Sequence, residues 1–87
     1  MRTIERSSAF KRDFKKHGDI DAALIEVLYK LLNDDPLPEK YRDHSLIGDW
    51  DGYRECHVKP DLLLIYKQPD ENTLRLARFG SHSELFG

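Results

Sequence analysis

A chain of 87 residues, 39% hydrophobic and 34% charged, is predicted to form one globular domain, because it is too short for two and too apolar for disorder. No apolar run reaches the roughly 18 residues that a membrane-spanning helix needs, and the charged N-terminus is unlike a signal peptide. The single cysteine, Cys56, excludes an internal disulfide, so we expect a small core residue in a cytoplasmic protein.

The formal net charge of -2 gives no long-range attraction for a polyanion, but the charges are unevenly distributed. Residues 1–17 carry six Lys or Arg against two acids, residues 18–51 carry three against nine, and residues 52–87 carry five of each. A nucleic acid would therefore meet only local basic patches. We expect a large scaffold that already holds the substrate to supply part of the affinity.

The first third of the chain is predicted to contain a short strand at residues 2–6 and two helices. Ser7 or Ser8 can cap the first helix, and Gly18 can end it. Asp19 is the predicted cap of the second helix. Apolar residues recur there at the spacing of one helical face: Leu24, Val27, Leu28, Leu31 and Leu32.

Residues 34–52, with two prolines and two glycines, are predicted to form a long loop, and loops of this length in small domains usually carry function. Three strands should follow. Successive side chains of residues 53–58 should point to alternate sides of a strand, which places Glu55 and His57 on the same side. Residues 62–66 are continuously apolar, as in a strand buried on both faces. Residues 73–79 form the next strand and residues 81–87 a short tail.

This order predicts an α+β fold in one domain spanning residues 1–87, with two N-terminal helices packed on one face of a small antiparallel β-sheet. The other face is then free to form a groove. Trp50 is expected to anchor the long loop to the body rather than to stack on a base.

Three of the four histidines are placed for chemistry. His44 lies in the long loop, His57 in the first strand of the meander and His82 just after the last strand, where one edge of the sheet can gather them. His17, at the end of a basic helix, is set aside. Histidine suits both proton transfers of RNA cleavage because its ordinary pKa, about 6.5, is near neutrality.

Two further residues complete this candidate site. Arg78 has the planar guanidinium that matches phosphate oxygens, and it is four residues from His82. In a regular strand Arg78 would lie on the same face as Leu74 and Leu76. Either that face has polar residues at its rim, or a β-bulge turns Arg78 to another direction. Asp61, in the turn after residue 58, can orient a histidine or share in the proton transfers.

Other interpretations of the same residues remain open. A zinc site could be built from His44, His57, His82 and Asp61, although their spacing matches no compact metal motif. The histidines could also be scattered residues without a joint role. No serine or cysteine nucleophile motif and no phosphate-binding glycine loop is present.

The order of residues nevertheless resembles one family. Residues 41–67, YRDHSLIGDWDGYRECHVKPDLLLIYK, and the ending RFGSHSELFG at residues 78–87 are similar to the YafQ family of bacterial toxins in the RelE/ParE superfamily. The likeness extends over the whole chain, since the two helices and the proline-rich loop also fit. Leu62 is a departure, because the best-known member has an aromatic residue there, which bears on base stacking and codon preference.

The resemblance implies a RelE-like fold and a metal-independent endoribonuclease without cofactors that cleaves mRNA in the A site of the 70S ribosome by 2′-hydroxyl attack. It implies roles in cleavage for His44, His57, Asp61, Arg78, His82 and Phe86. His82 is the first choice for proton transfer, Arg78 would hold the phosphate and Phe86 would position the bases. Arg54 and Lys59 are assigned with Phe86 to substrate binding.

The resemblance also implies a DinJ-like antitoxin that wraps the toxin, with operator DNA bound only through the antitoxin complex and no membrane partner. Two alternatives within the superfamily stay open. One is a toxin that poisons gyrase without cutting RNA, and the other is a degenerate toxin that serves only as co-repressor.

Overall fold

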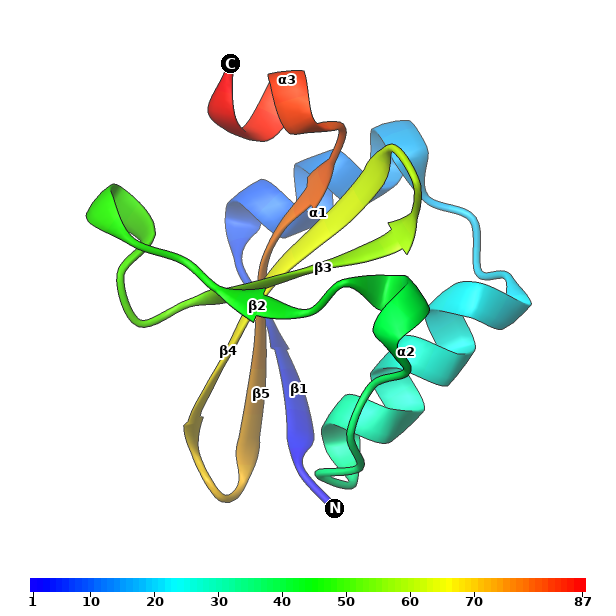
Figure 1. Cartoon of the computed structure of the whole chain (residues 1–87), viewed down its shortest axis with the longest axis vertical. Coiled ribbons are helices and arrows are strands. Elements are labelled where there is room, and N and C mark those ends of the chain that lie inside the picture. Colours follow the sequence, from blue (N-terminus) through cyan, green and yellow to red (C-terminus); the bar gives the residue numbers. More distant parts are fainter.

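The computed structural model describes all 87 residues and has a five-stranded sheet in the order β1-β5-β4-β3-β2 (Figure 1). The strands are Thr3–Arg6, His44–Ser45, Arg54–Lys59, Leu62–Asp70 and Thr73–Gly80, for β1 to β5. The α+β class is confirmed. The purely antiparallel sheet is wrong, because β1 pairs with β5 in parallel while the other three pairs are antiparallel. The alternation of apolar and polar residues along a strand shows which of its sides is buried, but not which strand lies next to it. The sequence therefore could not predict that β1 lies at the sheet edge beside β5.

Two helices follow β1. Helix α1 spans Ser8–His17, with Ser7 as its cap and Gly18 directly after it, as predicted. Helix α2 spans Ala22–Leu32, and its cap is Asp21 rather than Asp19, because the Asp21 carboxylate accepts the Leu24 amide hydrogen bond. No helix in the structure has the length and apolar character needed to cross a membrane.

The central strand β4 separates two apolar clusters. On one side, Leu64 and Tyr66 pack with α1 and α2, and Cys56 from β3 lies in the same cluster with no exposed surface. Burial raises the pKa of the Cys56 thiol, which leaves it a neutral core residue as expected. On the other side, Leu63 and Ile65 pack with a smaller group: Leu46, Trp50, Tyr53, Ala77 and Leu85.

Residues 34–52 are more ordered than the predicted loop. They contain two single-turn 3-10 helices, Glu39–Tyr41 and Gly48–Trp50, on either side of β2. Trp50 packs on the smaller cluster and meets Tyr53 edge-to-face with ring centroids 5.3 Å apart, which fits its predicted anchoring role. Through β2, the segment adds a short antiparallel strand to the edge of the sheet beside β3 (Figure 1).

The last residues form a helix and not an irregular tail. Helix α3 spans His82–Phe86 and begins with a capping box, in which Ser81 and Glu84 bond each other's backbone amides. Leu85 turns into the smaller cluster and fixes the helix on the sheet face away from α1 and α2. The S-x-x-E pattern of residues 81–84 is the sequence signal for the start of this helix.

The two-sided burial of β4 gives a test of the fold. Replacing Leu64, which has no exposed surface, with Ala should lower the free energy of unfolding by about 2–5 kcal/mol, because it leaves a cavity. Ile47→Ala is the control, since that side chain is 88% exposed and should change stability by less than about 0.5 kcal/mol. Urea unfolding measures both, and equal effects would contradict the described core.

Candidate functional site

Two predicted histidines meet at the sheet edge beside a buried carboxylate. His44 on β2 pairs in register with Glu55 on β3, and the His44 and His57 ring centroids are 6.5 Å apart. A Glu55 oxygen, Oε1, lies 3.2 Å from His57 Nε2 and 3.8 Å from His44 Nε2. Glu55 is 4% exposed and is the one charged residue in the buried class. Burying a carboxylate is costly unless it is paired, so Glu55 depends on these two rings.

Sequence reasoning placed Glu55 on the same side as His57 and gave it no role. The available signal was the two-residue spacing, which in a strand puts an acid and a histidine on one face. What the spacing could not show is that β2 would pair with β3 and bring His44 beside a carboxylate that the fold buries. Glu55 is therefore a member of the candidate site that only the pairing of β2 with β3 reveals.

The other nitrogen of each ring faces a backbone carbonyl. His44 Nδ1 lies 2.8 Å from the Arg42 carbonyl oxygen, and His57 Nδ1 lies 3.4 Å from that of Pro60. Carbonyl and carboxylate oxygens only accept hydrogen bonds, so each ring lies between two acceptor oxygens. These oxygens fix the orientation of the His57 ring at the sheet edge.

His82 belongs to the same end of the sheet and to a different element. His57 is opposite Leu63, and Leu63 is opposite Gly80, so at the usual strand spacing His57 and Gly80 are about 10 Å apart. His82 follows as the first residue of α3, exposed, with its ring 5.1 Å from that of Phe86. The structure brings His44 and His57 together and leaves His82 with Phe86, without a direct contact between the two groups.

His17, which sequence reasoning set aside, connects α1 to α3. Its Nε2 lies 2.8 Å from Glu84 Oε1, and Lys16 Nζ lies 2.8 Å from Glu84 Oε2. These hydrogen bonds, together with that of the Ser81 amide, hold the pKa of Glu84 well below its ordinary value. His17 thus contributes to the placement of α3, which carries His82.

Arg78, the cation predicted to hold phosphate, is paired with a carboxylate. Ile65 pairs with Arg78 and Tyr66 with Leu76, so β5 has a β-bulge between these two residues. The bulge changes the direction of the Arg78 side chain, which was one of the two alternatives that the sequence left open. Its Nε lies 2.7 Å from Asp13 Oδ2 on α1, and the same oxygen accepts the Phe79 amide at 3.0 Å. Arg78 therefore ties β5 to α1 in this structure.

Arg54 and Lys59 are paired in the same way. Arg54 Nη2 lies 3.0 Å from Asp43 Oδ2, and the other oxygen of Asp43 accepts a 2.5 Å bond from the Tyr66 hydroxyl. Lys59 Nζ lies 2.5 Å from the cap residue Asp21. Each cation predicted to bind substrate thus already has an acidic partner.

Asp61 is exposed in the turn between β3 and β4, with no hydrogen bond or ion pair through its side chain. The next residue, Leu62, packs on the helix-side cluster. No group of three His, Cys, Asp or Glu side chains is spaced as the ligands of a metal ion. The predicted zinc ligands are dispersed, since only His44 and His57 among them are in contact.

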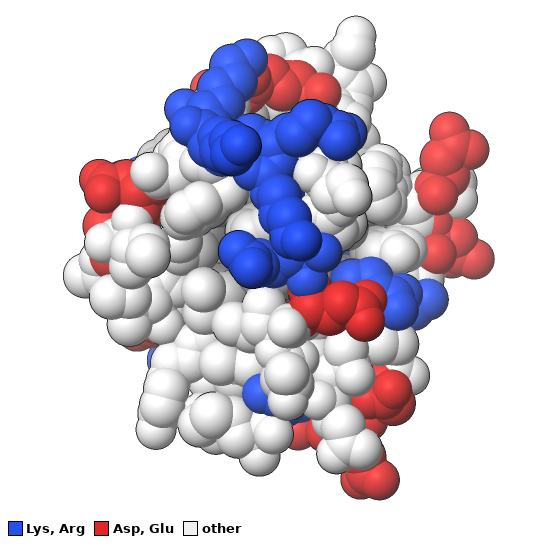
Figure 2. Space-filling view, turned by 180° about the vertical axis from the view of Figure 1, so that it is seen from behind, with Lys and Arg blue, Asp and Glu red and all other residues white.

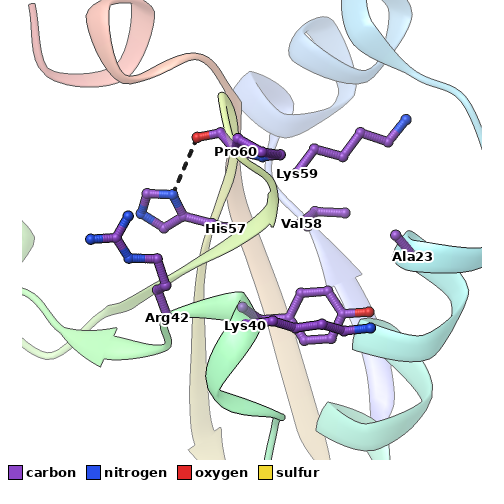
Figure 3. Close-up of a pocket in the computed structure, with 8 residues that line it drawn as sticks. Ala23, Lys40, Arg42, His57, Val58, Lys59 and Pro60 are labelled. Atoms are coloured by element: carbon purple, nitrogen blue, oxygen red, sulfur yellow. Dashed lines mark hydrogen bonds between the residues drawn. The ribbon is translucent and has the colours of Figure 1, made fainter.

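A pocket of about 400 Å³ opens beside His57, at the end of β3 (Figure 3). It is lined by residues from α2, the first 3-10 helix and the β3–β4 turn: Ala23, Lys40, Tyr41, Arg42, His57, Val58, Lys59 and Pro60. Three of these eight carry a positive charge and none a negative charge, so the pocket suits an anionic ligand.

A second basic surface lies on the opposite side of the molecule. The rear view shows Lys and Arg side chains gathered in a band (Figure 2). Helix α1, which lies at the back in Figure 1, supplies four exposed cations: Lys11, Arg12, Lys15 and Lys16. The positive charge of residues 1–17 is thus concentrated on a helix away from the His44–His57 pair.

With this geometry established, comparison with known proteins identifies the family. A family model described as the bacterial toxin of type II toxin-antitoxin system, YafQ, matches residues 2–87. The chain belongs to the YafQ toxin family. The resemblance inferred from residues 41–67 and 78–87 is therefore confirmed.

Several relatives of this YafQ family member match it along nearly their full length. The mRNA interferase toxin YafQ of Escherichia coli strain K12 is 42% identical over 91 residues, covering 100% of this chain and 98% of that protein. A metal-bound toxin from Helicobacter pylori is 50% identical with a TM-score of 0.86, covering 99% of this chain and 100% of that one. YafQ in the E. coli DinJ–YafQ complex is 42% identical with a TM-score of 0.82, and the match covers 100% of both chains.

The Asp13–Arg78 pair predicts how stability depends on pH. Burial alone would raise the pKa of Asp13, but hydrogen bonds from Arg78 and the Phe79 amide outweigh it and hold the pKa below its ordinary value of 3.8. The pair therefore stabilises the fold above that value, and this contribution is lost as the pH falls through the lower pKa of the folded state.

Asp13→Asn should reduce stability near pH 7 and flatten the loss of stability on acidification below about pH 4. Urea unfolding at several pH values measures this. Asp51→Asn, at an exposed carboxylate without a side-chain hydrogen bond, is the control and should retain the acid dependence of the unchanged protein. Parallel curves for the two variants would contradict the role of Asp13.

Proposed function

We propose that this YafQ family member is an mRNA endonuclease toxin that cleaves message in the ribosomal A site. The observation that carries the proposal is the His44–Glu55–His57 group at the sheet edge, with His82 at the same end of the sheet. Full-length similarity to a protein named mRNA interferase supports it. A net charge of -2 favours a substrate presented by the ribosome over capture of free RNA.

The proposed reaction is an attack of the 2′-hydroxyl on the adjacent phosphorus. A base takes the 2′-hydroxyl proton, the O2′–P bond forms, the P–O5′ bond breaks, and an acid protonates the leaving 5′-oxygen. This gives a 2′,3′-cyclic phosphate and a free 5′-hydroxyl. The ring of His57, with acceptors at both nitrogens, suits the acid. His82, whose ring contacts Phe86, suits the base.

The remaining predicted residues have supporting roles in this proposal. Glu55 orients His44 and His57, and Asp61 adjusts the charge beside them. Phe86, 39% exposed, can stack on a base next to the scissile bond. Arg54, Lys59 and Arg78 fix the loops around the site through their carboxylate partners and can exchange those partners for phosphates of the message.

The proposed partners are a DinJ-like antitoxin, the 70S ribosome and mRNA, with operator DNA bound only through the antitoxin complex, and all of them place the protein in the cytoplasm. The E. coli relative has been solved as a DinJ–YafQ complex. On this chain, exposed apolar side chains beside α2 offer a surface for such a partner to cover, among them Ile20, Ile25 and Tyr29 at 56–70% exposure.

Cleavage should depend on the His82 side chain and should not change when the neighbouring Ser83 is replaced. Expression of the unchanged protein should arrest growth and produce new message ends within codons, detected by primer extension. His82→Ala should abolish both by removing a proton-transfer group, with a loss of at least about 10²-fold in cleavage rate. Ser83→Ala, one residue along on the same exposed turn, should cleave like the unchanged protein.

Growth arrest with intact message would contradict nuclease activity and favour a toxin of the gyrase-poisoning kind. Equal cleavage by His82→Ala and the unchanged protein would contradict only the role of His82. Absence of growth arrest would favour a co-repressor without toxin activity.

Cleavage should also be independent of transition metals, since the proposed proton transfers use side chains alone. A chelator selective for zinc and copper over magnesium keeps ribosomes assembled while removing such ions. Cleavage rates in a purified translation reaction should be equal with and without it. A rate that falls with the chelator and returns on adding zinc or copper would contradict the metal-independent mechanism.

A further inference from the structure

Arg42 is the one arginine in the pocket beside His57, and it has no acidic partner. It takes part in none of the ion pairs of the structure, and its guanidinium group donates no hydrogen bond within the protein. Its side chain is exposed and lies on the same side of the pocket as the His57 ring (Figure 3). An anion entering the pocket would therefore meet an unpaired guanidinium next to a histidine.

The backbone at Arg42 is in an unusual conformation. Its φ of 51° and ψ of 43° are in the left-handed region, which residues other than Gly, Asn and Asp rarely adopt and which costs about 1 kcal/mol or more. This conformation presents the Arg42 carbonyl to His44 Nδ1 at 2.8 Å. The carboxylate of the neighbouring Asp43 bonds Arg54 and Tyr66 and makes no ion pair with Arg42. A single residue thus orients His44 and carries the free cation.

The three cations predicted from sequence differ from Arg42 in this respect. Arg54, Lys59 and Arg78 each hold a carboxylate within 3.0 Å, and those carboxylates belong to different elements of the fold. A phosphate bound by any of them must compete with that carboxylate and loosen a structural contact. Binding at Arg42 requires no such exchange.

We infer that Arg42 binds the non-bridging oxygens of the phosphate that is cleaved and stabilises the charge that develops there. This inference rests on the nuclease activity proposed above. The guanidinium stays protonated throughout, while the O2′–P bond forms and the P–O5′ bond breaks at the phosphorus it contacts. Its planar fork suits two phosphate oxygens at once, which an ammonium group cannot reproduce.

The test compares variants in a purified 70S translation reaction with a defined message, measuring kcat and KM for cleavage. Arg42→Asn removes the charge while keeping a residue that tolerates the left-handed region, so the fold and the His44 contact are retained. Arg42→Lys restores the charge without the fork. Arg12→Asn, at an exposed and unpaired arginine on α1, is the matched control for the loss of one positive charge.

We expect Arg42→Asn to lower kcat by about 10²-fold with little change in KM, and Arg42→Lys to recover part of the loss. Arg12→Asn should keep kcat, and all variants should keep the urea midpoint of the unchanged protein. Unchanged kcat in Arg42→Asn, a change confined to KM, or an equal kcat loss in Arg12→Asn would each overturn the inference. If the unchanged protein and Arg12→Asn produce no message ends, the proposed nuclease activity itself fails.

Discussion

Leu63, Leu64, Ile65 and Tyr66 point alternately into two apolar clusters, and the arrangement of the whole chain depends on this two-sided burial of β4. The cluster on one side needs α1 and α2 to cover it. The cluster on the other is too small for a helix pair and is covered by Trp50, Tyr53 and the single turn of α3. This second face is therefore only partly covered, which leaves polar residues of β2, β3 and α3 accessible around its edge.

Three aspartates form ion pairs that hold the segments around the candidate site in position. Asp13 fixes the bulge of β5 through Arg78, Asp21 fixes the β3–β4 turn through Lys59, and Asp43 fixes the segment before β2 through Arg54. Partly exposed pairs of this kind add little stability individually. Their role here is positional, because each joins residues distant in sequence at the borders of the candidate site.

The candidate site has two parts with different surroundings. His44, Glu55 and His57 form one group of neighbouring side chains on paired strands, whereas His82 and Phe86 lie on a helix of five residues. The first part is fixed by β-sheet pairing and the second by one apolar anchor, Leu85, and by the contacts of Glu84 with α1. Both parts lie at the same end of the sheet, so a nucleotide chain placed across β4 would meet His57 on one side and His82 on the other.

The sequence by itself determined the α+β class, the two helices and the double burial of β4, since these follow from the periodicity of apolar residues and from capping residues such as Ser7. It also identified the family, because the spacing of residues 41–67 and 78–87 is specific. Only the tertiary structure decided that β1 adds in parallel, that α3 exists in place of a tail, and that Glu55 is buried between two histidines. It also decided that the predicted cations are paired and that Arg42 is not. The physical reason is that these features depend on which strands become neighbours, and contacts between residues distant in sequence leave no periodic signal along the chain.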